Sequence, residues 1–264
     1  MPHSQIVESA TIANLRDLGG VPLPDGTRVR PGTAFRSGQL DRLDLRSDPV
    51  VAALGIRTVV DLRTDFERVS RPDRVPAGAH LLVADVMADT SGAGAANRLG
   101  AAMADPATAN RTLGGGRARR ALEQDYRSFV TSASARAAYK QLVTALARPE
   151  GGPVLFHCTA GKDRTGWGAS LLLLLLGADE PTVRDEYLAV APAVRAAFAP
   201  QVAAFTGAGG DPEVAEAILG VHPSYLAAAV DAIADQWGDV ESYARAGLGL
   251  KDETLDALRL RLTV

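Results

Sequence analysis

The chain has 264 residues, of which 47% are hydrophobic and 22% are charged, and this composition is typical of a globular protein. Its net charge of −3 gives no electrostatic reason to expect a nucleic-acid partner. The single cysteine excludes an intramolecular disulfide and fits a reducing cytoplasm, so we expect a cytoplasmic protein. The leucines at 171–176 lie in an apolar stretch of about a dozen residues, whereas a membrane span takes about 20, so we expect no transmembrane segment. Nothing in the sequence indicates an oligomeric state.

The first third of the chain carries strand signals. Short apolar or β-branched runs predict strands at 33–35, 58–62 and 80–84, and a Pro-Asp-Gly turn predicts a small hairpin at 21–29. Ser47-Asp48-Pro49 predicts the start of a short helix. Thr64 and Glu67 match a capping box, which predicts a second helix.

The rest of the chain is predicted to be mostly helical. Residues 119–148 predict one long helix that Pro149 ends, and a short strand at 154–156 precedes an apolar helix at 169–178. Further helices are predicted to start near Pro181, Pro192, Pro212 and Ser224, with a last one at 253–262. Strands alternating with helices predict an α/β fold, in which a central, mainly parallel sheet is flanked by helices and the C-terminal half is helical. No linker or repeat divides the chain, so we expect a single domain over residues 1–264.

Residues 86–118 form a long connection that is rich in Ala and Gly. Connections of this length are uncommon unless they are functional or unstructured. Two interpretations therefore stay open, a lid insertion that is helical around 95–104 and a floppy insertion.

The most informative segment is 157–166, which reads His-Cys-Thr-Ala-Gly-Lys-Asp-Arg-Thr-Gly and is called the cysteine loop below. It lies between a predicted strand and a predicted helix, so its backbone amides converge at a helix N-terminus, which is an anion site. Cys158 is expected to be a thiolate there and to act as a nucleophile. Arg164 offers a planar fork for two phosphate oxygens. The predicted reaction is substitution at phosphorus through a cysteinyl-phosphate intermediate, which is then hydrolysed.

Other residues of the cysteine loop are assigned supporting roles. His157 is expected to orient Cys158 or tune its thiolate, and Thr165 to donate a hydrogen bond to the sulfur. The Lys162 side chain adds a second cation. Because amides and Arg164 supply the electrostatics, we expect no metal and no cofactor. The residues expected to bind phosphate within the loop are Thr159, Ala160, Gly161 and Lys162.

Other readings of this loop are weaker. A Walker A loop needs a glycine where Phe156 stands and a Ser or Thr where Asp163 stands. A zinc site would need further cysteines or clustered histidines, and the four histidines of this chain are scattered.

The pattern His-Cys-x5-Arg-Thr-Gly resembles the signature of cysteine-based protein tyrosine and dual-specificity phosphatases. The Gly-Lys-Asp-Arg version, together with Asn-Leu-Arg-Asp-Leu-Gly-Gly at 14–20, is similar to a bacterial subgroup of that family. The resemblance continues at 35–37, 55–63, 218–221 and 225–226. It implies a protein-tyrosine-phosphatase-like fold and phosphotyrosine hydrolysis, with phosphoserine, phosphothreonine and phosphoinositides as further substrates. That family has exported members without an ordinary signal, so export stays an alternative to the cytoplasm.

Two aspartates compete for the role of general acid, which protonates the leaving oxygen. Asp163 lies inside the cysteine loop, and the resemblance favours it. Asp85 is the alternative, because it follows the predicted strand and would stand at the rim of the site. A purely structural role is open for both, as a brace of the loop for Asp163 and as a turn residue for Asp85.

Four residues outside the loop are further candidates for substrate binding. Arg16 and Asp17 belong to the motif at 14–20, and either brace the loop or form a turn ion pair. Arg63 follows a strand, and either reaches the rim of the site or pairs with Asp65 or Glu67. Tyr126 lies on the helix predicted at 119–148 and is expected to line the pocket.

The expected partner is a phosphorylated protein, lipid or small molecule. Lys162 gives the phosphoinositide option a physical basis, since it adds positive charge beside the phosphate site. One alternative keeps the chemistry but acts on a small-molecule phosphate, such as a nucleotide or sugar phosphate. Another alternative is a pseudophosphatase that binds phosphate without turnover, and the intact Cys158 and Arg164 favour the enzyme.

Overall fold

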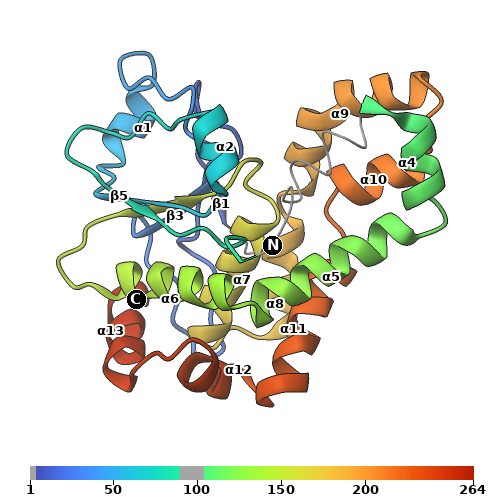
Figure 1. The fold of residues 1–264 in the computed structure, drawn as a ribbon. Coiled ribbons are helices and arrows are strands. Elements are labelled where there is room, and N and C mark those ends of the chain that lie inside the picture. Colours follow the sequence, from blue (N-terminus) through green and yellow to red (C-terminus); the bar gives the residue numbers. More distant parts are fainter. Residues whose placement is uncertain (1–3, 90–103) are drawn as a thin grey trace.

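The computed structural model describes residues 4–89 and 104–264, and its centre is a six-stranded sheet (Figure 1). The strand order is β1-β2-β3-β6-β4-β5, and β3, β6, β4 and β5 run parallel while β1 and β2 are antiparallel. The predicted mainly parallel sheet is therefore confirmed. The strands are β1 (Gln5–Ile6), β2 (Arg16–Asp17), β3 (Ala34–Ser37), β4 (Thr58–Asp61), β5 (His80–Val83) and β6 (Val154–His157).

Strand β6 lies between β3 and β4, and all four of its residues are buried. Its side chains alternate between two hydrophobic clusters, as expected of a strand covered on both faces. Leu155 joins the smaller cluster, whereas Phe156 joins the larger one. Because β6 is central and parallel to its neighbours, its carboxyl end opens at the edge where α/β sheets bind ligands.

Helices α1 (Pro49–Ala53) and α2 (Asp65–Ser70) cover one face of the sheet (Figure 1). The Asp48 side chain accepts from the backbone N–H of Val51 and caps α1. The capping box predicted between Thr64 and Glu67 is present in both directions at α2. The sequence signals for these helix starts are confirmed.

The prediction of one long helix at 119–148 is wrong, because the segment forms two helices. These are α5 (Arg117–Thr131) and α6 (Ala133–Ala147). Ser132 between them has an extended backbone, with ψ of 150°, and its hydroxyl accepts from the N–H of Ala135. A serine favours this capping conformation over a helix interior, and here the local hydrogen bond decides the break.

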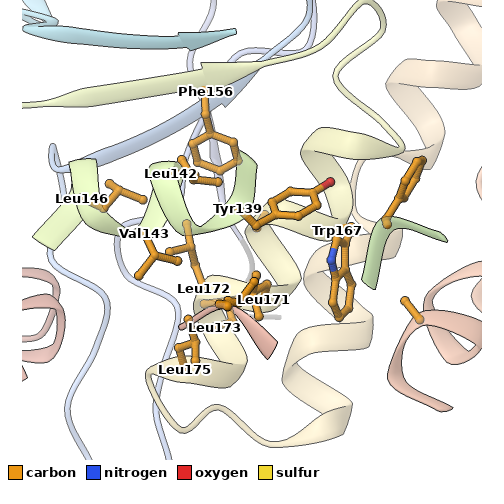
Figure 2. Close-up of a cluster of buried hydrophobic side chains, with 14 of the residues drawn as sticks. Tyr139, Leu142, Val143, Leu146, Phe156, Trp167, Leu171, Leu172, Leu173 and Leu175 are labelled. Carbon is orange, nitrogen blue, oxygen red and sulfur yellow. The ribbon is translucent and has the colours of Figure 1, made fainter. Parts of the chain in front are cut away.

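The leucine-rich helix α7 (Arg164–Leu175) lies on the other face of the sheet, beside α6. Figure 2 shows Trp167 and the leucines of α7 next to Tyr139 and Leu142 of α6, with Phe156 of β6 above them. Leu171, Leu172 and Leu173 are at most 1% exposed, so the helix is buried on all sides, as the unbroken apolar run indicates.

The remaining helices begin close to the predicted positions. Helices α8, α9, α10 and α11 each carry a proline at the first or second helical position, where its missing N–H is not needed. The predicted helix around 95–104 falls largely outside the described residues. The elements are α4 (Pro106–Leu113), α8 (Glu180–Leu188), α9 (Ala191–Gly207), α10 (Pro212–Leu219), α11 (Pro223–Trp237), α12 (Val240–Ser242), the π-helical turn η1 (Tyr243–Gly247) and α13 (Asp252–Leu262).

Helices α4, α9 and α10 gather at one side of the molecule, away from the sheet (Figure 1). They share a hydrophobic cluster of their own with the first turn of α5, centred on Phe205 of α9 and Val214 of α10. We call α4, α9, α10 and the start of α5 the helical arm. The arm is therefore held by a small core that is separate from the main one.

One helical stretch among the described residues, Glu180–Gly207, is long and apolar enough to cross a membrane, and 17% of its apolar window is buried. Helices α10 and α11 pass the same test together, although they are bent by 52°. Such helices are weak evidence, because core helices of soluble proteins meet the same criterion. The absence of a transmembrane segment therefore stays a prediction.

Candidate active site

The cysteine loop joins the end of β6 to the start of α7 and forms the floor of a cavity of about 180 Å³. Cys158 is 2% exposed and is the first loop residue that lines this cavity. The walls are mainly apolar side chains from the helical arm and α5. They are Leu113, Ala118, Ala121, Leu122, Phe129, Phe198 and Ile218. A buried sulfur at the base of an apolar pocket suits a nucleophile that attacks a substrate bound in the cavity.

Arg164 at the first position of α7 is held by Glu67 of α2 through two charge-assisted hydrogen bonds. Nη1 and Nη2 of Arg164 each lie 2.7 Å from a carboxylate oxygen of Glu67, which also accepts from the Thr159 hydroxyl. Burial alone would raise the pKa of Glu67, but the bonds from Arg164 and Thr159 hold it well below the ordinary value. Glu67 thus fixes the position of the Arg164 guanidinium.

Glu67 is a site residue that the sequence reasoning missed. Its carboxylate completes the capping box by accepting from the N–H of Thr64 at 2.9 Å, and the same group clamps Arg164. The capping-box pattern located Glu67 but gave only a local role for it. Its position after β4, next to the central strand, is the signal that would have pointed to the site.

His157 is fully buried beneath the loop, where it contacts a network of charges. Its Nδ1 lies 3.2 Å from the carbonyl oxygen of Cys158, and its Nε2 lies 3.0 Å from Asp73. Burial alone would raise the pKa of Asp73, but His157 and Arg63 lower it. This arrangement fits the predicted role of His157 in orienting Cys158.

Arg63 belongs to this buried network and is not among the residues that line the pocket. Its Nη2 lies 2.8 Å from Asp61 and 2.8 Å from Asp73. Both predictions for Arg63 are therefore wrong. Its side chain does not line the pocket, and its ion-pair partners are Asp61 and Asp73 rather than Asp65 or Glu67. No local pattern points to Asp73, which lies ten residues further along in a loop.

Asp61, Asp73 and His157 offer ligand atoms that lie within 4.8 Å of one another, a spacing that metal sites also show. The guanidinium of Arg63 already bonds both carboxylates, however. The group is therefore better described as a buried ion-pair network than as a cation cage.

Lys162 uses all three of its ammonium protons within the protein. Its Nζ lies 2.9 Å from Asp163 and 3.1 Å from the carbonyl oxygens of both Ile218 and Gly220. These carbonyls stand at the C-terminal end of α10, where the helix dipole favours a cation. Lys162 thus ties the cysteine loop to the helical arm as well as lining the pocket.

Asp163 lines the pocket, and its side chain is 24% exposed. The hydroxyl of Tyr126 donates to its Oδ1 at 3.2 Å and lies 2.8 Å from the hydroxyl of Tyr187. Tyr126 is fully buried behind Asp163 rather than in the pocket wall, and burial raises the pKa of its hydroxyl well above the ordinary value. Asp163 therefore lines the pocket, and Tyr126 supports its carboxylate from behind rather than lining the pocket itself.

Asp85 lies at a turn next to α2 and is not among the lining residues. Its carboxylate accepts from the N–H of Asp65 at 3.2 Å and of Met87 at 2.9 Å, and pairs with Arg68 at 3.5 Å. Its two oxygens are engaged in closing this turn, which agrees with the structural alternative for Asp85.

Thr165 and the motif at 14–20 differ in how they meet the loop. Thr165 is fully buried, but its hydroxyl has no hydrogen-bond partner within residues 4–89 and 104–264, so the predicted hydrogen bond to the Cys158 sulfur is not formed there. Arg16 instead donates to the carbonyl of Ala189 at 2.8 Å, and Asp17 accepts from the N–H groups of Gly19 and Gly32. Neither Arg16 nor Asp17 lines the pocket.

Two other residues of the recognised motifs do contact the cysteine loop. Asn14 donates to the carbonyl oxygen of Gly161 at 3.1 Å, and Arg36 donates to the same oxygen at 2.9 Å. Sequence reasoning quoted both motifs but gave these residues no role. Their contact with the loop depends on β3 lying between β2 and β6 in the sheet, which no local pattern shows.

Comparison with known proteins shows the family to which this chain belongs. The chain matches the model of the tyrosine phosphatase family over residues 7–264. It belongs to that family. It is also 34% identical to the triple specificity protein phosphatase PtpB of Mycobacterium tuberculosis, over 93% of this chain and 95% of PtpB. Membership confirms the predicted phosphatase of the tyrosine and dual-specificity type, so the protein is a phosphoric monoester hydrolase.

Other matches extend over most of the chain. Protein H16_A0669 of Cupriavidus necator is 32% identical over 90% of this chain and 82% of its own length. The crystal structure of P. aeruginosa TpbA in complex with phosphotyrosine covers 85% of this chain and 91% of its own, with 18% identity and a TM-score of 0.35. The family assignment rests on the sequence matches.

Proposed function

We propose that this family member hydrolyses phosphotyrosine in proteins through a cysteinyl-phosphate intermediate, with Cys158 as nucleophile and Asp163 as general acid. The observation that carries the proposal is the pairing at the cavity floor. A buried cysteine stands at the end of the central strand, and the guanidinium of Arg164 is held beside it by Glu67. The amides of a helix N-terminus complete an anion site at that point.

The proposed steps balance within the residues of the site. The Cys158 sulfur attacks phosphorus, an S–P bond forms, and the bond to the leaving oxygen breaks while that oxygen takes a proton from Asp163. A water then attacks phosphorus and gives its proton to Asp163. The S–P bond breaks, and inorganic phosphate leaves a regenerated thiolate. Arg164 and the loop amides stabilise the equatorial oxygens in both steps.

The apolar wall supports an aromatic leaving group. Leu122 and Phe129 of α5 and Phe198 of α9 flank the pocket, and such side chains bury a ring with favourable contacts. The name of the mycobacterial relative, a triple specificity protein phosphatase, supports a substrate range wider than phosphotyrosine, and we propose phosphoserine, phosphothreonine and a phosphoinositide as further substrates of this chain. A small-molecule phosphate is the rival substrate class.

The family match over residues 7–264 supports one phosphatase domain, to which the described end of segment 86–118 contributes Leu113 as part of the pocket wall. The single cysteine supports a cytoplasmic location, because it is a free thiol that works reduced. Export of the folded protein is the alternative that fractionation would detect.

A substrate panel with the parent protein and Cys158→Ser tests the proposal. The panel spans a phosphotyrosine peptide, a phosphoserine peptide, a soluble phosphoinositide, a nucleotide monophosphate and a sugar phosphate. We expect the highest kcat/KM on the phosphotyrosine peptide, and no hydrolysis by Cys158→Ser although it still binds phosphate.

Each other outcome removes a stated part of the proposal. Parent-like hydrolysis by Cys158→Ser refutes the nucleophile assignment. A preference for the nucleotide or sugar phosphate refutes the protein substrate. Phosphate binding by the parent without turnover of any panel member indicates a non-catalytic phosphate-binding protein.

A further inference from the structure

We propose that Asn14 and Arg36 are positioning residues that lock the peptide between Gly161 and Lys162 in its phosphate-binding orientation. The inference rests on the proposed function, because it takes the cysteine loop to be the phosphate site. It assigns a role to the motifs at 14–20 and 35–37, whose side chains lie outside the pocket.

The carbonyl oxygen of Gly161 accepts two hydrogen bonds from the sheet side of the loop, from Arg36 Nη2 at 2.9 Å and Asn14 Nδ2 at 3.1 Å. In a planar trans peptide, the C=O group and the following N–H point in opposite directions. Holding the carbonyl toward β3 therefore directs the N–H of Lys162 away from β3. That is the side of the cavity, which Ala160 and Lys162 line.

External hydrogen bonds are needed to hold this peptide, because Gly161 has no side chain that would restrict its own backbone rotation. Its φ is +70°, a region in which glycine rotates without steric penalty. A side chain is excluded there, since a Cβ would stand 2.5 Å from the backbone of Ser37. If the peptide flipped, a carbonyl oxygen would face the phosphate, and one donor would become a repulsive acceptor.

Both locking residues carry features that would be unfavourable without such a role. Arg36 is fully buried, and its charge is balanced by the equally buried Glu186 at 3.2 Å. Asn14 has a φ of 55° and is the only residue other than glycine with a positive φ in the described chain. Asparagine tolerates this conformation, which aims its amide at Gly161.

The first experiment replaces Asn14 by glycine, which keeps the backbone conformation and removes only the amide. The inhibition constant of inorganic phosphate is measured against hydrolysis of 4-nitrophenyl phosphate. We expect it to rise about five- to tenfold, as for one lost hydrogen bond to a constrained group, with the unfolding temperature close to that of the parent. Tyr243→Phe is the matched control, because it removes a buried hydrogen bond to the carbonyl of Val130, and its phosphate inhibition should not change.

The second experiment addresses Arg36. Replacing it alone would leave the buried carboxylate of Glu186 without the guanidinium of Arg36, so both are replaced by methionine in Arg36→Met/Glu186→Met. We expect this variant to weaken phosphate inhibition at least as much as Asn14→Gly does. Adding Asn14→Gly to it should weaken inhibition by more than the product of the two separate factors, because either donor alone still holds the carbonyl.

The outcomes separate the two proposals. If phosphate does not inhibit the parent, the proposed function fails, and this inference fails with it. If phosphate inhibits the parent and Asn14→Gly and the double variant keep the parental inhibition constant, only the lock is refuted. Weakening by the Tyr243→Phe control to the same degree also overturns it, because the effect would then be general destabilisation.

Discussion

The cysteine loop is held on one side by polar, charged groups and faced on the other by an apolar wall. On the sheet side, Glu67, Arg36 and Asn14 fix the loop and Arg164 through buried hydrogen bonds with defined geometry. On the arm side, Phe198 and Ile218 contribute apolar contact area rather than directional hydrogen bonds. If the proposed function holds, we expect the sheet side to determine which reaction occurs and the arm side to determine which phosphate esters fit.

The two sides also differ in how they are anchored. Arg36 lies on β3, and Glu67 lies on α2, the helix that follows β4. The sheet shares its hydrophobic core with α6 and α7. The arm has its own small hydrophobic cluster, and Lys162 is a polar link from the loop to it. We therefore expect substitutions in the two parts of the chain to change the reaction and the substrate range separately.

The largest effect is expected when the sheet side loses its central charge. Glu67→Gln leaves Arg164 buried without a carboxylate, which should reduce the free energy of unfolding by about 3 kcal/mol at pH 7 and lower kcat. The pKa of Glu67 is lowered in the folded protein, so its stabilisation is present above the ordinary carboxyl pKa and is lost as pH falls through the folded value.

The difference in stability between parent and Glu67→Gln should therefore narrow below about pH 4.3, the pKa of an unfolded glutamate. Urea unfolding at pH 7, 4 and 3 measures it. Glu241→Gln, which removes an exposed carboxylate paired with Arg245, serves as the control and should change stability little. A constant difference at all three pH values would contradict the role given to Glu67.

The next largest effect concerns the proton donor, at the junction of the two sides. Asp163→Asn should lower kcat about 100-fold on an alkyl phosphate, whose leaving oxygen needs a proton, and far less on 4-nitrophenyl phosphate. Asp85→Asn should resemble the parent on both substrates, since it closes a turn. Steady-state rates with the two esters decide, and equal losses on both would exclude Asp163 as the acid.

A smaller effect should follow from trimming the arm side. Phe198→Ala is expected to raise KM for an aryl phosphate about fivefold, because apolar area is lost from the wall. Inhibition by inorganic phosphate, which does not reach the wall, should stay as in the parent. Phe66→Ala removes a phenylalanine that is 61% exposed and outside the pocket, and it should leave both constants unchanged.

The smallest effect is expected from removing the hydroxyl that supports Asp163. Tyr126→Phe removes the hydroxyl between Asp163 and Tyr187, which should reduce stability by about 1 kcal/mol and kcat by a small factor. Thermal unfolding and the rate on an alkyl phosphate measure the two effects. A loss as large as that of Asp163→Asn would mean that Tyr126 itself takes part in proton transfer.

Sequence reasoning recovered the features that depend on local patterns. The strand before Cys158, the buried leucine helix, the capping box and the helix starts at prolines all follow from residues a few positions apart. The break at Ser132 was missed because a serine among helix-forming residues signals a cap only weakly until tertiary packing selects it.

The site was predicted where the chemistry lies in one contiguous segment, and missed where it depends on pairing between distant segments. Glu67 and Arg36 lie 97 and 125 residues from their partners in the loop, which no periodicity connects. Arg63 likewise forms an ion pair with Asp73 rather than with a carboxylate on the helix that follows it. Knowing the strand order would have supplied these contacts.

The separate hydrophobic cluster of the helical arm has a consequence for amide exchange. A unit held by a few small side chains around Phe205 can open without disrupting the main core, so it forms a cooperative unit of lower local stability. Backbone amides of α4, α9 and α10 should then exchange with solvent before those of α6 and α7. The wall of the pocket would thus loosen many times during the lifetime of a folded molecule in which the catalytic floor stays intact.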